Sequence, residues 1–241
     1  MKNIKYITLL FILFLIIIGY IVLNLPMFDI TNIIIKGNNL LSQNDIVTYS
    51  NIKMGENIFK VNLKEVKKNL LRNPRIEETS MKRVFPSTIF ISVSERNDFA
   101  ALYFLGSFVK IDKEGIVLEV KQDMDNTSIL IITGIEIVDC TPNERVKLKD
   151  NNQLDAIIEI VFFMDKYELK DLVSEINIED INDIRIYFIK GIEARVSRNS
   201  DIEEKIYMLK NIIIDIIKNN RGQGYIEMRG VKDPVFYPIT K

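Results

Sequence analysis

Residues 82–96 read KRVFPSTIFISVSER, and this stretch decides the fold of the first half of the chain. After the turn at Phe85-Pro86, the apolar Ile89, Ile91 and Val93 occupy every second position. A repeat of two residues is typical of a β-strand with one buried face. The preceding residues, 77–84, also have the composition of a strand. We therefore expect two successive strands, 77–84 and 88–95.

Upstream of these strands the sequence predicts one strand and two short helices. The β-branched run from Ile30 to Lys36 ends at the turn signal Gly37-Asn38. Helix-capping patterns then precede two amphipathic segments, Ser42 with Asp45 before the first and Asn62 with Glu65 before the second. The second helix covers about residues 63–71 and ends before Asn73-Pro74. The predicted order is β-α-α-β-β in about 70 residues.

Further upstream, 23 residues from Tyr6 to Phe28 carry no charge. About 20 apolar residues in a helix cross a hydrocarbon core of about 30 Å. No pair of small residues marks a cleavage site after this segment, so we expect a retained membrane anchor and not a cleaved signal peptide or a buried helix. Because Lys2 and Lys5 precede it, the positive-inside rule predicts that residues 1–5 are cytoplasmic and residues 29–241 lie outside.

Residues 99–241 predict a second module that mixes strands and helices. Strand-like runs occur at 102–105, 107–111, 116–120, 130–133, 172–178, 184–188, 193–196 and 224–229. A helix over 153–167 is expected to bury Leu154, Ile157, Ile158, Val161 and Phe162. A longer helix begins at a capping pattern of Ser200 with Glu203, and its buried stripe is predicted to contain Ile202, Ile206, Leu209, Ile213, Ile216 and Ile217.

Five short stretches in this order resemble the FtsQ family of bacterial division proteins, called DivIB in Gram-positive organisms. They are IIIKGN at 33–38 with LS at 41–42, GENIFKVN at 55–62, NPRI at 73–76, KRVFPSTI at 82–89 with VSER at 93–96, and GYIEMR at 224–229. One departure is Asn97-Asp98, where the family usually carries proline. The resemblance implies an α+β protein with an N-terminal transmembrane helix at 6–28, a POTRA domain at 29–98 and an FtsQ/DivIB-type β domain with an extended sheet at 99–241.

The resemblance also implies a function. Proteins of this family are understood to be non-enzymatic, single-pass scaffolds of the divisome that bind small bitopic partners of the FtsB/DivIC and FtsL type. They help to position and control septal peptidoglycan synthesis, so a septal peptidoglycan synthase is a further candidate partner. The expected location is the cell membrane at the division septum, with the C-terminal domains outside.

The end of the chain is where we expect the partner to bind. A terminal strand leaves backbone groups that a second chain can pair with. Val235, Phe236 and Tyr237 lie between Pro234 and Pro238, and apolar aromatic residues of this kind are typical interface anchors. From periodicity alone, they fit the core of the module equally well. The residues we expect to contact the partner are Tyr225, Glu227, Arg229, Val235, Phe236, Tyr237 and Ile239.

Composition excludes several kinds of catalytic site. The chain has no His, so it can form no Ser-His-Asp triad and no His-ligated zinc site. It has one Cys, Cys140, so it can form no internal disulfide. The S-x-x-K pattern at 50–53 lacks the companion motifs of penicillin-recognising enzymes, and Asp123-Met124-Asp125 lacks the rest of a calcium loop. Neighbouring carboxylates such as Glu77-Glu78 point to opposite faces of a strand.

We expect no cofactor, no metal, no nucleic acid and no small-molecule substrate, in keeping with a net charge of −1. The two modules differ in net charge. Residues 29–98 hold 11 Lys and Arg against 8 Asp and Glu, whereas residues 99–241 are acidic overall. A basic module next to an anionic bilayer can rest on lipid headgroups or on an acidic partner. The alternatives left open are an anchored wall-modifying enzyme and a POTRA-type chaperone for polypeptides.

Overall fold

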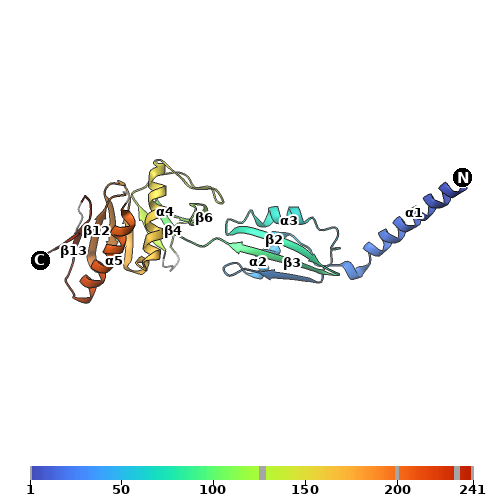
Figure 1. Ribbon diagram of the computed structural model, residues 1–241, viewed down its shortest axis with the longest axis horizontal. Helices are drawn as coiled ribbons and strands as arrows, with labels where there is room; N and C mark the ends of the chain where they lie inside the picture. Colours follow the sequence, from blue (N-terminus) through green and yellow to red (C-terminus); the bar gives the residue numbers. More distant parts are fainter. Residues whose placement is uncertain (1, 125–128, 199–200, 231–233, 240–241) are drawn as a thin grey trace. The chain divides into compact units, whose positions relative to one another are not determined.

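The computed structural model describes residues 2–124, 129–198, 201–230 and 234–239. The chain divides into two compact units, Met1–Arg96 and Asn97–Lys241, each with its own core (Figure 1). The predicted α+β class is confirmed, with an apolar N-terminal helix, a small POTRA-like domain and a larger sheet-rich domain.

The N-terminal helix α1 covers Lys2–Leu23. Its segment Tyr6–Leu23 has a mean hydropathy of 2.9, and none of it is buried, so it is long and apolar enough to cross a membrane. The helix ends at Leu23, although the uncharged run continues to Phe28. The reason is Pro26, which holds Leu25 in an extended conformation with ψ of 143°. A short 3-10 helix, η1 (Pro26–Phe28), leads into the first domain.

The POTRA-like domain has the predicted β-α-α-β-β order. Its elements are β1 (Asn32–Lys36), α2 (Gln43–Ser50), α3 (Leu63–Leu70), β2 (Ile76–Val84) and β3 (Thr88–Glu95). β3 is the central strand, parallel to β1 and antiparallel to β2. The capping box of Ser42 and Asp45 is present at α2, and Asn62 caps α3 by accepting hydrogen bonds from the N–H groups of Lys64 and Glu65.

The core of this domain follows from the predicted alternation in β3. Ile89, Ile91 and Val93 are buried, and they pack in one cluster with Ile46 of α2 and Leu70 of α3. Burying one such side chain contributes about 1.5–3 kcal/mol. The turn between β2 and β3 contains a cis peptide bond between Phe85 and Pro86.

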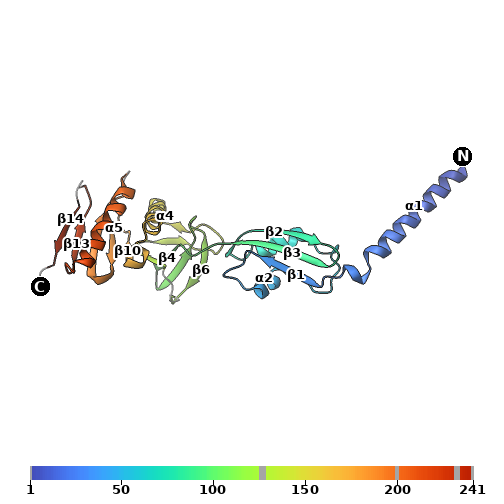
Figure 2. The same ribbon diagram turned by 60° about the horizontal axis from the view of Figure 1, so that its bottom comes forward.

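The second unit is built on a nine-stranded mixed sheet. The strand order is β14-β13-β12-β11-β10-β7-β4-β5-β6, and α4 and α5 pack on one face of it (Figure 2). The bounds are β4 (Ala100–Phe104), β5 (Ser107–Ile111), β6 (Val117–Lys121), β7 (Leu130–Thr133), α4 (Asn151–Lys166), β10 (Val173–Asn177), β11 (Ile184–Phe188), β12 (Ile192–Val196), α5 (Ile202–Lys218), β13 (Gly224–Glu227) and β14 (Val235–Pro238).

Some details of the second unit differ from the predictions. Phe162 of α4 is 54% exposed, so its predicted burial is wrong, and Ile158 and Ile217 are only partly buried. The apolar run from 160 to 163 continues around the whole helix, so periodicity alone cannot show which side faces the sheet.

The start of α5 also differs from the prediction. The predicted cap Ser200 lies outside the described residues, and the N-cap of α5 is Asp201, whose side chain makes no capping hydrogen bond. A small sheet of β8 (Ile137–Asp139) and β9 (Lys147–Leu148) was not predicted, because runs of three and two residues carry no clear period.

Candidate functional site

The last two strands of the chain form one edge of the nine-stranded sheet. β13 is parallel to β12 on one side and antiparallel to β14 on the other. β14 pairs with β13 alone and is the edge strand of the described sheet. We refer to residues 223–239, without the undescribed 231–233, as the C-terminal edge.

The two faces of the C-terminal edge have different roles. Ile226 is fully buried and Phe236 is packed partly buried against the same core, on the face that α4 and α5 cover. Their strand neighbours Tyr225 and Tyr237 point to the opposite face, which we call the open face, and are 37% and 43% exposed. The structure thus separates two residues that the sequence could not distinguish: Phe236 belongs to the core and Tyr237 to the surface.

Tyr225 and Tyr237 form an aromatic pair on the open face. They are directly opposite each other in the β13–β14 ladder, and their rings stack with centroids 4.8 Å apart at 18°. The guanidinium of Arg195 on β12 lies 5.7 Å from the Tyr225 ring, a cation–π contact, and its Nε is 2.8 Å from a carboxylate oxygen of Glu193. The pair is therefore held in place from its inner side and exposed toward the edge.

Arg229 supports the strand end next to this pair. Its guanidinium binds the Glu227 carboxylate in bidentate fashion, at 2.8 and 2.6 Å, and also lies 2.7 Å from Asp183. Hydrogen bonds from Arg229 hold the pKa of the Glu227 carboxyl below its ordinary value. Arg229 is thus bound to Glu227 and Asp183 of its own domain and holds the end of β13 in place, and its contact with a partner stays a prediction.

We expect the Arg229→Gln substitution to raise the pKa of Glu227 toward its ordinary value. Because the folded-state pKa is lowered, Glu227 contributes stability above its unfolded-state pKa, and this contribution is lost as pH falls through the folded-state pKa. NMR titration of the Glu227 side-chain carboxyl in both proteins measures the shift. An unchanged midpoint in the variant would contradict the assigned ion pair.

The backbone of β14 offers few free hydrogen-bonding groups. The N–H of Ile239 donates to the carbonyl of Gln223 at 2.9 Å, which fixes the phase of the ladder. Since hydrogen-bonded and non-bonded pairs alternate in an antiparallel ladder, Tyr237 directs its backbone groups toward β13, and Phe236 and Pro238 direct theirs outward. Proline has no N–H, so Phe236 carries the outward donor of β14. Prolines on an edge strand limit indiscriminate pairing with other chains.

Gly224 is required for the close approach of β14. A Cβ atom at this position would lie 2.4 Å from the carbonyl oxygen of Tyr237 and 2.6 Å from the Phe236 ring. No side chain can occupy this space without displacing β14.

The remaining predicted contact residues differ in placement. Glu227 and Val235 lie opposite each other on the open face, and Val235 is 45% exposed. Ile239, after β14, is 64% exposed. Sequence reasoning missed Glu193 and Arg195, which complete the open face on β12. The alternation of charged and apolar residues from 192 to 196 is the signal that could have identified them.

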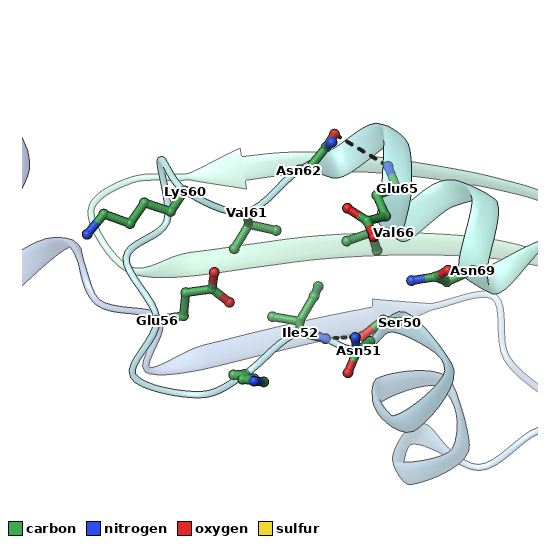
Figure 3. A pocket seen from close by; sticks show the side chains of 11 residues that line it. Ser50, Asn51, Ile52, Glu56, Lys60, Val61, Asn62, Glu65, Val66 and Asn69 are labelled. Atoms are coloured by element: carbon green, nitrogen blue, oxygen red, sulfur yellow. Dashed lines mark hydrogen bonds between the residues drawn. The ribbon is translucent and has the colours of Figure 1, made fainter.

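The patterns of possible catalytic interest have structural roles. Ser50 of the S-x-x-K pattern ends α2, where its hydroxyl donates to the carbonyl of Val47 at 2.7 Å and accepts from the N–H of Ile52. An open pocket of about 270 Å³ lies beside Ser50, between α2, α3 and the loop that joins them (Figure 3).

Asp125 of the calcium-like pattern lies outside the described residues. Within the described ranges, no group of three or more His, Cys, Asp or Glu residues could hold a metal ion.

Comparison with known proteins shows which protein family the chain is related to. Residues 28–96 match the family model of the POTRA domain, FtsQ-type, and residues 102–229 match that of the cell division protein FtsQ/DivIB, C-terminal. β14 follows the second matched range.

Named relatives are similar over most of their length. Cell division protein DivIB of Clostridium botulinum (strain Hall) is 29% identical over 240 residues, which cover 98% of this chain and 92% of the relative. DivIB of Clostridium tetani is 28% identical over 88% of this chain and 80% of its own length. FtsQ of Geobacter sp. (strain M21) is 24% identical over 78% of this chain and 68% of its own length.

A solved structure of the major extracytoplasmic domain of DivIB from Geobacillus stearothermophilus covers 52% of this chain and 98% of its own, at 20% identity and a TM-score of 0.33. The family relationship rests on the two sequence models, the second of which alone spans more than half of the 241 residues. The chain therefore belongs to the FtsQ/DivIB family of cell division proteins.

Proposed function

We propose that this protein is a non-enzymatic, single-pass membrane scaffold of the divisome. In this proposal α1 anchors it in the cell membrane at the septum, with residues 1–5 in the cytoplasm and both folded domains outside. Family membership supports the role in division. The apolar segment Tyr6–Leu23 of α1 and the two lysines before that segment support the topology.

The C-terminal edge is the surface we propose for binding small bitopic partners of the FtsB/DivIC and FtsL type. The observation that carries the proposal is the exposed, stacked pair Tyr225 and Tyr237 on an edge strand. Rigid aromatic side chains supply large contact areas at low entropic cost and are common interface anchors. Through these partners the protein would help to position and control septal peptidoglycan synthesis.

The arrangement of the edge suggests how a partner binds. The one outward N–H of β14, at Phe236, allows little backbone pairing, so side-chain contacts on the open face must supply most of the affinity. A partner segment that lies across Tyr225 and Tyr237 would also reach Glu193 and Arg195 on β12. Its complementary features would be apolar residues for the tyrosine pair and a charged residue for this ion pair.

We expect the double substitution Tyr225→Lys and Tyr237→Lys to abolish co-purification of such partners with the full-length chain. Each aromatic anchor contributes about 2 kcal/mol, so the affinity should fall by a factor of about 30 for each. Both tyrosines lie on the surface, and the circular dichroism spectrum should stay unchanged. Phe162→Lys is the matched control, because Phe162 is an exposed aromatic residue of the same domain on α4.

Two results would contradict the proposal. One is normal partner recovery by the double variant. The other is sustained release of fragments when the purified ectodomain is incubated with peptidoglycan, which would indicate a wall-modifying enzyme.

A further inference from the structure

An exposed apolar surface lies at one end of the POTRA domain, the end at which the chain enters the domain from α1. It combines residues from three separate segments of the chain: the η1 turn, the loop between α2 and α3, and the end of β2 with the turn after it. We call it the apolar tip, and its main members with their exposed fractions are Met27 (57%), Met54 (57%), Phe59 (38%), Val84 (42%) and Phe85 (58%).

The aromatic side chains and the loop of the apolar tip are held in place by contacts within the domain. The Phe59 ring contacts Phe28 edge-on at a centroid distance of 5.1 Å and stacks on Phe85 at 5.3 Å. Arg83 fixes the loop from below, because its guanidinium donates to the carbonyls of Ile58 and Val61, both at 2.8 Å. A group of apolar side chains that is held exposed to water in this way indicates a surface that binds another molecule or a membrane.

The chain itself places the tip near the end of α1. Phe28 follows Leu23, the last residue of α1, by five residues, which can extend over no more than about 18 Å. The 3-10 turn over Pro26–Phe28 shortens this distance, and the Asn57 side chain donates to the Leu23 carbonyl at 2.8 Å. A headgroup layer extends about 5–8 Å beyond the hydrocarbon core on each side. If α1 spans the bilayer, Met27 and the loop around Asn57 therefore start at headgroup level.

Charged residues border the tip, and three lysines there outnumber the two carboxylates, Asp29 and Glu56. Lys53, Lys60 and Lys82 are exposed residues of the same loop and of β2. In Figure 3 the ammonium end of Lys60 points away from Asn62 and Asn69 of the pocket wall. Aromatic rings bordered by lysines are typical of protein segments at a membrane interface, where the rings lie among the headgroups and the ammonium groups meet lipid phosphates.

We propose that the apolar tip inserts into the headgroup region of the outer leaflet of the membrane that α1 crosses. The occupant of this surface is lipid, because its first residues continue directly from the membrane helix. The POTRA domain would then rest on the bilayer instead of moving freely on its linker. This inference rests on the membrane anchorage proposed above.

The absence of Trp from the sequence allows a clean test with the full-length chain. Three single substitutions introduce one indole each: Phe85→Trp in the tip, Phe14→Trp in α1, and Leu40→Trp as the control. Leu40 is 57% exposed, and its backbone N–H is bound by Glu95 at the far end of β3, about 23 Å along the strand from Thr88. Each protein is reconstituted in phosphatidylcholine–phosphatidylglycerol vesicles with and without brominated lipid, which quenches indoles on contact.

The proposal predicts quenched, blue-shifted emission for Phe85→Trp and Phe14→Trp and unquenched emission for Leu40→Trp. Quenching of Phe14→Trp without quenching of Phe85→Trp would overturn the tip insertion and leave the anchor intact. Lack of quenching in Phe14→Trp would overturn the anchor, and the tip insertion with it. Equal quenching of Phe85→Trp and Leu40→Trp would show non-specific adsorption of the domain and would also overturn the proposal.

Discussion

Gly224→Ala is expected to detach β14 from the sheet and to abolish partner binding while the rest of the protein stays folded. The added Cβ would lie 2.4 Å from the Tyr237 carbonyl oxygen, a backbone atom that cannot move without moving the strand. Overpacking of this kind costs about 1–3 kcal/mol when a core must absorb it. An edge strand that pairs on one side only can instead dissociate, since its local stability is low.

Amide hydrogen exchange measures this effect directly. In the Gly224→Ala protein, the N–H of Ile239, which donates to the Gln223 carbonyl, should lose its protection, whereas the amides of β11 and β12 should keep theirs. Gly222→Asn is a suitable control, because a Cβ at Gly222 meets nothing within 4 Å and Asn tolerates its positive φ of 86°. Full protection of Ile239 together with normal partner binding in Gly224→Ala would refute the role assigned to β14.

Gly37→Ala is expected to destabilise the POTRA domain strongly. Gly37 has a φ of +85°, and a Cβ there would lie 2.1 Å from the carbonyl oxygen of Val93 in the central strand β3. The left-handed conformation costs about 1–2 kcal/mol, and the clash adds about 1–3 kcal/mol. The sum is comparable with the lower end of the stability of a whole domain, about 5 kcal/mol.

Gly55→Ala separates the two causes. Gly55 has a similar φ of +80° but nothing within 4 Å of its Cβ position, so it carries the conformational cost alone. In urea titrations of the full chain, followed by hydrogen exchange in β2 and β3, Gly37→Ala should unfold the POTRA domain at a clearly lower denaturant concentration than Gly55→Ala. Equal midpoints for the two variants would show that the contact between Gly37 and Val93 is not close.

Local patterns in the sequence were sufficient to predict the helices and strands of the POTRA domain and their order, but not the pairing of its strands. The alternation at Ile89, Ile91 and Val93 predicts the buried face of β3, and Ser42 with Asp45 predicts the start of α2, because strands and caps depend on residues close together in the chain. The helix α1 ends earlier than the uncharged run for an equally local reason, the proline at 26.

The C-terminal edge could be predicted only in part, because its geometry depends on pairing between distant strands. The apolar stretch from Val235 to Tyr237 identifies an unusual chain end, but a period of two does not say which of two neighbours faces the core. That choice is made by the register with β13, which sets Phe236 beside Ile226 and Tyr237 beside Tyr225. Glu193 and Arg195 enter the open face through β12, about 40 residues earlier in the chain.

The central claim is that the open face at the C-terminal edge binds a division partner, and photo-crosslinking in native membranes tests it most directly. A photoreactive phenylalanine analogue replaces Tyr237 in the full-length chain, and in a second protein it replaces Phe162, the exposed aromatic residue of α4. The account predicts a covalent adduct with a small single-span division protein from position 237 and none from position 162. Adducts from position 162 alone, or from neither position while the partner still co-purifies, would contradict it.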